Sequence, residues 1–289
     1  MDGNESASPR PAAIGRYRIV GELGRGAMGL VYKAEDTALG RTVAVKTIEL
    51  AFAVEPAERA DFEKRFIAEA KIAARLSHPG IVVCHDVGKD PETGVLFIVL
   101  EHLHGTPLSE VVKAGSLLPP LQAVSIVAKV ARALHYAHAH GVVHRDMKPA
   151  NVMLLESGDP KILDFGVAKL EGAQLTMAGQ LFGSPLYMSP EQALVKPVDG
   201  RSDLFSLGSI LYALLAGRHP FVAESIPIIL TRVVGEEPTP VSQVTRGLPG
   251  SIDYVIARAL AKDPAERYAS GDQMAEDLED VAAGREPRH

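Results

Sequence analysis

The feature that most constrains the fold is a change of pattern about a third of the way along the chain. In residues 41–48 the side chains alternate, so that Lys46 lies on the face opposite Val45, which predicts a β-strand. From Pro119 onward the apolar residues recur instead with a 3.6-residue period, which is typical of amphipathic helices. A strand-rich segment followed by a helical one predicts two lobes, each with its own core.

The same pattern predicts the domain boundaries. Residues 1–13 are small, polar and proline-rich and indicate a loose tail, whereas residues 14–284 form the folded domain. Within it we expect a strand-rich lobe over about 14–100, a hinge at 101–105 and a helical lobe over 106–284, followed by a short tail at 285–289. The individual segments that we expect are a strand at 95–100 and helices at 56–76, 202–216, 226–234, 251–261 and 270–283.

Composition excludes several classes of protein. Thirty Lys and Arg against 36 Asp and Glu give a net charge of −6 without a basic block, so nucleic acid is not an expected partner. Cys84 is the only cysteine, which excludes an internal disulfide and favours a reducing compartment. The apolar run at 204–217 is too short for a membrane span and predicts a buried helix, and the N-terminus lacks the apolar core of a signal peptide. We therefore expect a cytoplasmic protein, or the cytoplasmic domain of a membrane-anchored one if the chain is a fragment.

Residues 24–31 fit the pattern G-x-G-x-x-G-x-V. Glycines are needed where the backbone must approach phosphate oxygens closely, although the spacing alone also fits a tight turn. A dinucleotide-binding fold requires a helix after the glycines, but residues 30–34 continue as a strand and residues 37–40 are typical of a turn. The segment therefore predicts a β-hairpin, and no Gly-Lys-Ser/Thr completes a Walker A loop.

Lys46 and Glu69 are two charges at positions that we expect to face inward. Glu69 lies between Phe66 and Ala73 on the apolar stripe of the helix predicted at 56–76. Burying either charge alone would be costly, which favours an ion pair between them. The alternative is that Glu69 faces solvent and pairs with Arg65.

Two polar segments follow short apolar ones in the second half of the chain. His144-Arg145-Asp146-Met147-Lys148-Pro149-Ala150-Asn151 follows the apolar residues 141–143, and Asp164-Phe165-Gly166 follows Ile162-Leu163. Carboxylate and amide oxygens are the hard ligands that Mg²⁺ prefers, and a lysine beside them suits a phosphate group. The two segments therefore predict a site for a divalent metal and a phosphate.

These segments occur in one order along the chain: the glycine pattern, Val43-Ala44-Val45-Lys46, Glu69, residues 144–151 and Asp164-Phe165-Gly166. In this order the chain resembles the eukaryotic-like (Hanks-type) protein kinases, and among them the bacterial Ser/Thr branch, from about Tyr17 to Val281. The resemblance implies an α+β, bilobal protein-kinase fold with a β-rich N-lobe, a mainly α-helical C-lobe and an ATP cleft between them. It also implies a serine/threonine protein kinase, a phosphotransferase that moves the γ-phosphoryl group of Mg-ATP to protein Ser/Thr hydroxyls.

The resemblance implies a nucleotide bound mainly by the strand-rich lobe, with adenine between Ala44 and Val31 on one side and Met153 of the helical lobe on the other. The three glycines would cover the phosphates, Lys46 held by Glu69 would bind the α- and β-phosphates, and the hinge backbone would bind adenine. Mg²⁺ would accompany ATP, and Mn²⁺ could replace it. The full set of implied nucleotide-binding residues is Leu23, Gly24, Arg25, Gly26, Ala27, Met28, Gly29, Leu30, Val31, Ala44, Lys46, Glu69, Leu100, Glu101, Leu103 and Met153.

The resemblance also implies roles in catalysis. Asp146 would orient the substrate hydroxyl and accept its proton, and Lys148 would neutralise charge on the transferred phosphoryl group. Asn151 and Asp164 would hold the metal ions. Lys148 and the residues 183–187 resemble the Ser/Thr-specific branch.

Regulatory residues are implied as well. Arg145 directly precedes the catalytic aspartate, an arrangement associated with phosphorylation of the activation loop, where the candidate hydroxyl groups are those of Thr176, Ser184, Tyr187 and Ser189. Thr176 is the favoured autophosphorylation site because it lies in the variable part of the loop, and Arg145 would contact its phosphate. An unmodified threonine is the alternative. Self-association of two chains would fit phosphorylation in trans.

The remaining implied roles are structural. Glu191 would pair with Arg267, and Asp203 would brace the backbone of the catalytic loop. His144 and Phe165 would form a column of side chains with Ala73 and Cys84, both small for that place, so the active arrangement would be only weakly preferred. The histidines near His144, among them His138, lack a completing Glu or Cys and therefore favour surface or packing roles over a zinc site.

Two other functions compete with an active protein kinase. A pseudokinase would bind a nucleotide or a partner without phosphoryl transfer, but Lys46, Asp146, Asn151 and Asp164 are all present. A small-molecule phosphotransferase of related fold is disfavoured, because residues 183–187 and 189–191 resemble a platform on which a peptide docks.

Overall fold

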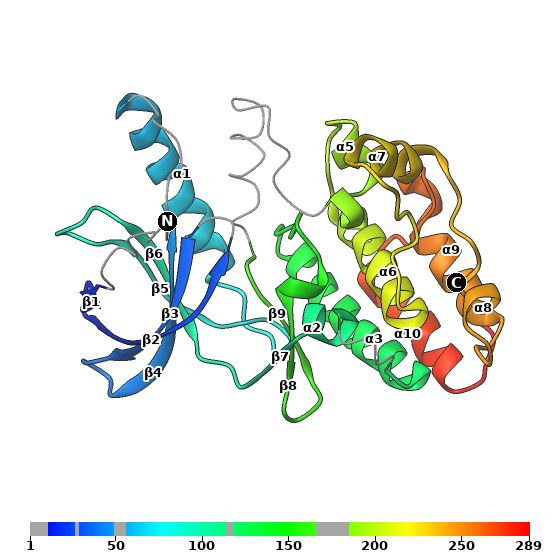
Figure 1. Ribbon diagram of the computed structural model, residues 1–289, viewed down its shortest axis with the longest axis horizontal. Coiled ribbons are helices and arrows are strands. Elements are labelled where there is room, and N and C mark those ends of the chain that lie inside the picture. The colour runs from blue at the N-terminus through cyan, green and yellow to red at the C-terminus, as the bar shows by residue number, and fades with distance from the viewer. Residues whose placement is uncertain (1–10, 27–28, 49–55, 114–117, 166–184) are drawn as a thin grey trace, which may run out of the picture. The chain divides into compact units, whose positions relative to one another are not determined.

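The chain divides into two compact units, which a computed structural model describes for residues 11–26, 29–48, 56–113, 118–165 and 185–289. The first unit comprises Met1–Ala74 and Val83–Leu103, and the second comprises Arg75–Val82 and His104–His289 (Figure 1). The chain thus finally leaves the first unit after Leu103, within the hinge predicted at 101–105.

The first unit is built on an antiparallel six-stranded sheet with the strand order β1-β2-β3-β4-β6-β5. One face of this sheet carries a core of buried side chains that includes Val43 and Val45, whereas Ala44 and Lys46 alternate with them, as the sequence pattern predicts. The strands are β1 (Ala13–Ile14), β2 (Tyr17–Gly26), β3 (Gly29–Asp36), β4 (Arg41–Ile48), β5 (Cys84–Lys89) and β6 (Leu96–Glu101).

Helix α1 (Pro56–Ala73) packs against β5 in the same unit. Phe62 and Phe66 are buried and stack with their ring centroids 6.4 Å apart, which confirms the predicted inward stripe. The helix ends at Ala73, three residues before the predicted end at Leu76. The prediction followed the buried side chain of Leu76, but the backbone N–H of Ser77 already bonds the hydroxyl of Tyr136, at 3.2 Å, instead of continuing the helix.

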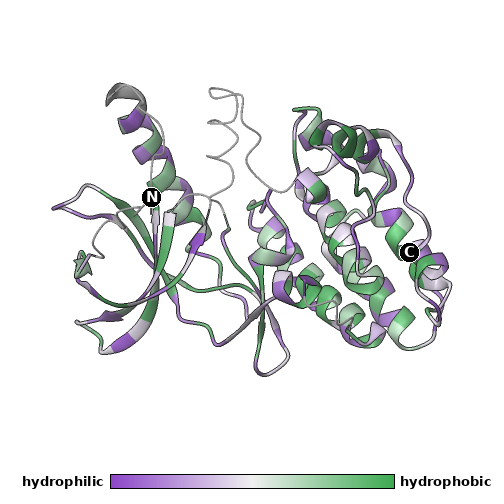
Figure 2. Cartoon of the chain, in the orientation of Figure 1, coloured by the Kyte–Doolittle hydropathy of each residue, from purple (hydrophilic) through white to green (hydrophobic). Residues whose placement is uncertain are grey.

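The second unit contains a small sheet, β7 (Gly105–Pro107), β8 (Val152–Leu155) and β9 (Pro160–Ile162), and a group of helices. Helix α6 (Gly200–Ala216) has buried residues all round, which confirms the buried helix predicted from the apolar run, and green predominates along it in Figure 2. The other helices are α2 (Leu108–Lys113), α3 (Pro120–Ala139), α5 (Pro190–Ala193), α7 (Ile226–Gly235), α8 (Val241–Val244), α9 (Ser251–Ala259) and α10 (Gly271–Ala282), with 3₁₀ turns η1 (Pro149–Asn151), η2 (Pro185–Tyr187) and η3 (Pro264–Glu266).

Local sequence explains where these helices begin and end. Helix α6 starts after Asp199, whose carboxylate accepts from the Arg201 N–H at 2.8 Å, and stops at Gly217 with a left-handed φ of 67°. Helix α10 packs against α3 from its first residue, Gly271, where an added Cβ would lie 2.2 Å from the Ala131 carbonyl oxygen. Only glycine permits this approach.

Residues 285–289, predicted to form a tail, lie against α10. One oxygen of Asp277 accepts from the backbone N–H groups of Arg288 and His289, at 3.0 Å each, and Asp280 pairs with Arg285 and Arg288. Among the residues that the structure describes, no helix is long and apolar enough to cross a lipid bilayer.

Candidate functional site

The glycine pattern forms the turn end of the β2–β3 hairpin in the first unit, as predicted, with Gly26 opposite Gly29. Gly29 has a φ of 147°, and an added Cβ would lie 2.3 Å from the Thr47 carbonyl oxygen, so a side chain is excluded there. At Gly24 an added Cβ would meet no atom within 4 Å, which leaves the backbone open to a ligand. The hairpin is tied to β4 because the Thr47 hydroxyl bonds both the N–H and the C=O of Leu30, at 3.0 Å each.

Lys46 lies on β4 directly opposite Val31 of β3 and Ile98 of β6, and only 9% of its surface is exposed. Glu69 lies on α1 beside buried Ala70 and is half-buried. Both residues belong to the first unit, and the ion pair between them stays a prediction. A nearly buried amine at the end of a glycine hairpin is suited to an anionic ligand such as a phosphate.

The end of β6 carries the residues predicted to form the hinge. The backbone N–H of Glu101 donates to the Val83 carbonyl at 2.9 Å, and the Val83 N–H donates to the Glu101 carboxylate at 2.8 Å. Leu100 lies opposite Ala44 across the sheet, and Leu103 is half-buried. These two bonds define the course of the backbone just before it leaves the first unit.

In the second unit, Asp146 lies at the centre of a polar cluster. Its Oδ2 accepts from the Lys148 ammonium at 2.5 Å and from the Asn151 amide at 3.1 Å. The same amide nitrogen also donates to the Asp146 carbonyl, at 2.7 Å, so both of its hydrogens point towards Asp146. The Asn151 amide oxygen therefore faces the other way.

Asp203 braces the backbone of this loop from α6. Its Oδ2 accepts from the His144 N–H at 2.8 Å and its Oδ1 from the Arg145 N–H at 2.7 Å, and its side chain is only 1% exposed. Arg145 has a left-handed φ of 68°, which a non-glycine residue keeps only when its surroundings hold it. Two bonds from one buried carboxylate provide that support.

His144 connects the loop to the segment that contains Asp164. Its Nδ1 accepts from the Asp146 N–H at 3.2 Å, so the ring proton lies on Nε2, which bonds the Leu163 carbonyl at 2.7 Å. The ring also packs edge-on against Phe165, with centroids 4.8 Å apart. His144 is fully buried and therefore contributes to structure and not to solvent chemistry.

Asp164 is brought next to Asn151 through the backbone of its neighbour. The Leu163 N–H donates to the Asn151 carbonyl at 2.9 Å, and Asp164 itself has a left-handed φ of 60°. Met153 lies on β8 opposite Lys161. The second unit thus gathers two carboxylates, an amide and an amine on loops held by buried bonds.

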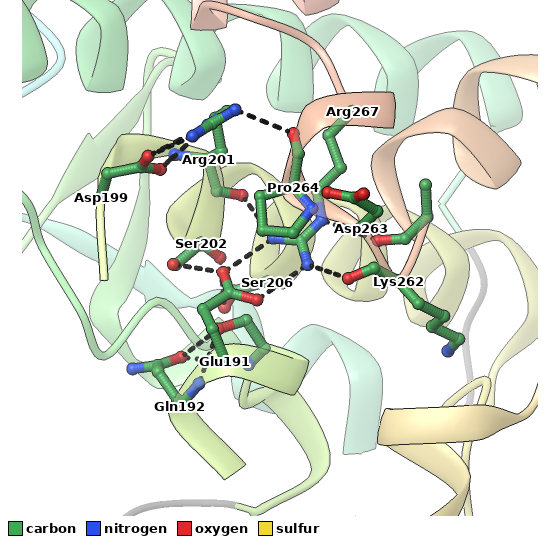
Figure 3. Close-up of polar contacts among 12 residues, drawn as sticks. Glu191, Gln192, Asp199, Arg201, Ser202, Ser206, Lys262, Asp263, Pro264 and Arg267 are labelled. Atoms are coloured by element: carbon green, nitrogen blue, oxygen red, sulfur yellow. Dashed lines mark hydrogen bonds and ion pairs between the residues drawn. The ribbon is translucent and has the colours of Figure 1, made fainter. Parts of the chain in front are cut away.

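Glu191 and Arg267 form a bidentate ion pair in the second unit, with both N–O distances 2.8 Å (Figure 3). The Ser202 hydroxyl also donates to Glu191, and Arg267 further donates to the backbone oxygens of Arg201, Ala261 and Lys262. Burial alone would raise the pKa of Glu191, but the bonds from Arg267 and Ser202 outweigh it, and the pKa is lowered. This pair joins α5 to the segment that precedes α10.

Four of the predicted site residues, Ala27, Met28, Thr176 and Ser184, lie outside the described residues. The predictions for them stay predictions. Arg25 and Leu23 lie on β2 and are exposed.

The family model for the protein kinase domain matches residues 17–278. The chain belongs to the protein kinase family. Its fold is the protein kinase fold, because the crystal structure of the kinase domain of PknI from Mycobacterium tuberculosis matches it with a TM-score of 0.75 and 31% identity, over 94% of this chain and 97% of the other.

Curated relatives assign this kinase domain to the bacterial Ser/Thr branch. A probable serine/threonine-protein kinase of Streptomyces coelicolor is 41% identical over 94% of the chain, and the serine/threonine-protein kinase PknB of Mycobacterium leprae is 39% identical over 96%. The chain spans 40% and 44% of the lengths of these two relatives, respectively.

Two side chains of this kinase domain escaped the sequence analysis. His138, expected to have a surface or packing role, bonds the Asp203 carboxylate through Nε2 at 2.7 Å. Gln192, for which no role was expected, donates to the Arg145 carbonyl at 2.6 Å. For Gln192, the pattern of Ser189 with a glutamine three residues later signals the capping box of α5 but not the contact with Arg145.

Proposed function

We propose that the chain is an active serine/threonine protein kinase that transfers the γ-phosphoryl group of Mg-ATP to hydroxyl groups of proteins. The observation that carries the proposal is the state of Asp146. Lys148 and Asn151 both bond its Oδ2, whereas its Oδ1 has no hydrogen-bond donor among the described residues. A carboxylate held in this way can accept the proton of a substrate hydroxyl with its second oxygen.

The first unit would bind the nucleotide. The open backbone at Gly24 supports a phosphate under the hairpin, and the nearly buried Lys46 supports a charge contact to it. Because the Glu101 N–H is already bonded to Val83, Glu101 would contact adenine through its carbonyl. Leu103 would supply the other backbone contacts.

Asn151 and Asp164 of the second unit would hold Mg²⁺. Both hydrogens of the Asn151 amide are used on Asp146, so the oxygen that remains is a hard ligand, as is the carboxylate of Asp164. When bound, the metal would neutralise the charge that develops on the phosphate oxygens.

Residues of the chain itself would position the substrate hydroxyl and stabilise the charge on the transferred phosphoryl group. Asp146 would orient the hydroxyl and accept its proton, while Lys148 would exchange part of its bond to Asp146 for the transferred phosphoryl group. Phosphoryl transfer needs little covalent help, so these contacts would supply most of the acceleration.

The activation loop would regulate the enzyme through Arg145. We propose autophosphorylation at Thr176, with phosphate contacts from the Arg145 side chain, whose backbone is held by Asp203. Mapping phosphopeptides after incubation with ATP tests this point. Fully active enzyme with an unmodified Thr176 would refute it.

The experiment for the main proposal compares the wild type with Asp146→Asn, using labelled ATP, Mg²⁺ and either a generic protein or the chain alone. The wild type should label serine or threonine, and the variant should be about 10²–10⁴-fold slower, since it cannot accept a proton. Asp159→Asn is the control, because Asp159 is an exposed carboxylate paired with Lys129.

Each competing function gives a different result. A pseudokinase would bind ATP with no incorporation into any protein. A small-molecule phosphotransferase would label small hydroxyl compounds only. Equal rates for Asp146→Asn and the wild type would show that Asp146 is not the proton acceptor.

A further inference from the structure

The side chain of Gln192 forms hydrogen bonds in two directions. Its Oε1 accepts from the N–H and the hydroxyl of Ser189, at 3.0 and 3.1 Å, which completes the capping box of α5. Its Nε2 donates to the Arg145 carbonyl at 2.6 Å, across 47 positions of the chain. Figure 3 shows Gln192 beside Glu191, whose ion pair with Arg267 anchors the same helix.

The acceptor of this bond is one end of the peptide unit that leads into Asp146. The other end, the Asp146 N–H, donates to His144 Nδ1 at 3.2 Å. One residue earlier, the Arg145 N–H is held by Asp203. Arg145 also has a left-handed φ, so this backbone depends on its neighbours to stay in place.

We propose that Gln192 is a positioning residue for phosphoryl transfer. Its amide holds the plane of the Arg145–Asp146 peptide unit, from which the Asp146 side chain projects, and so couples α5 to the proton acceptor. The inference rests on the proposed function for the role of Asp146. The hydrogen bond between Gln192 and Arg145 is observed directly and does not depend on the proposed function.

The oxygen and the nitrogen of the Gln192 amide have different partners, so a substitution that changes only one of them can distinguish positioning from helix capping. Replacing Gln192 by Glu keeps the oxygen that caps α5 but removes the donor to Arg145 and sets a negative charge against a carbonyl oxygen. Gln273 provides a matched control, because it follows Ser270 at the same capping position of α10 and its Oε1 accepts from the Ala269 N–H.

Steady-state kinetics with Mg-ATP and a peptide substrate form the first arm of the test. We expect Gln192→Glu to lower kcat about 10–100-fold, as loss of one bond to a partly buried carbonyl implies, with KM for ATP within about threefold of wild type. Gln273→Glu should match the wild type in both constants. A kcat of Gln192→Glu within twofold of an active wild type, or a change in KM alone, would overturn the proposal.

Hydrogen exchange provides an arm that does not depend on activity. Amides in residues 142–150 should exchange faster in Gln192→Glu than in the wild type and in Gln273→Glu. Unchanged exchange would overturn the proposal even if the wild type proved inactive, in which case only the proposed function would have failed. If Gln192→Glu does not fold, Gln192→Met takes its place, with Gln273→Met as the control that loses the capping oxygen at the same helix position, and the same outcomes are expected.

Discussion

Arg267 binds Glu191, which lies 76 positions away in the sequence, through two parallel hydrogen bonds. The side chain of Arg267 is fully buried. The pair joins α5, which carries Gln192, to the segment before α10. Because both charged groups have hydrogen-bond partners, this ion pair can lie buried within the second unit.

Replacing Arg267 by Met should lower the free energy of unfolding by about 3–5 kcal/mol, because it leaves a buried carboxylate without its partner. Urea denaturation measures the change. Lys129→Met is the control, since the Lys129–Asp159 pair is more than half exposed on both sides and should contribute about 0–1 kcal/mol. Equal losses of unfolding free energy in the two variants would contradict the expectation that a buried ion pair matters more than an exposed one.

The same pair predicts a dependence on pH. The pKa of Glu191 in the folded protein lies below its ordinary value of 4.5, so its contribution to stability is present above that pH and is lost as the pH falls below it. In Arg267→Met, burial without the arginine raises that pKa instead, so the difference in unfolding free energy between the wild type and the variant should begin to narrow above pH 4.5 and continue to narrow below it. A constant difference from pH 7 to pH 3.5 would argue against a charged Glu191.

Gly271→Ala should weaken the packing of α10 on α3. The new Cβ would lie 2.2 Å from the Ala131 carbonyl oxygen, a backbone atom that cannot move alone, so the helix must shift at a cost of about 1–3 kcal/mol. Gly235→Ala at the end of α7 is the matched control, because its Cβ would meet no atom within 4 Å. Thermal unfolding of both variants should show a clear loss for the first and none for the second.

Lys262 should make stability rise with pH in an alkaline window. Burial lowers its pKa to about 8, although its ammonium donates to the Val233 carbonyl and lies 4.1 Å from the Phe221 ring centroid. Between that value and the ordinary 10.5 the unfolded chain binds the proton and the folded chain does not, so the unfolding free energy increases with pH. Urea titrations from pH 7 to 10.5 should show this gain in the wild type and not in Lys262→Met.

Cys84 should react slowly with thiol reagents in the folded protein. It is half-buried on β5, and burial raises the pKa of its thiol to about 11, so little thiolate is present at neutral pH. Iodoacetamide labelling at pH 7.5 should be much slower in the native protein than in urea, and should accelerate as the pH approaches 11. Fast native labelling would instead indicate a reactive thiol at Cys84.

Two predictions that depended only on local sequence pattern were confirmed. The hairpin at residues 24–31 followed from glycines inside a strand pattern, and the buried helix followed from an apolar run without charges. The end of α1 was wrong by three residues, because a buried Leu76 extends the apolar pattern beyond the last helical bond.

The contacts of His138 and Gln192 could not be predicted in the same way. Their partners, Asp203 and the Arg145 carbonyl, lie 65 and 47 positions away, and the acceptor in the second contact is a backbone atom that any residue carries. No periodicity or motif in a single sequence predicts a hydrogen bond between residues so far apart. It depends on how α3 and α5 pack against the loop.

By itself, the sequence determined the family of this protein and the kinds of chemical group at its site, since those depend on residue types at set spacings along one chain. The tertiary structure alone decided which oxygen of Asp146 is bonded, how Arg145 is held in its left-handed conformation and why Gly271 carries no side chain. The reason is physical: hydrogen bonds and close packing act over about 3–4 Å in space, and only folding brings distant segments within that range.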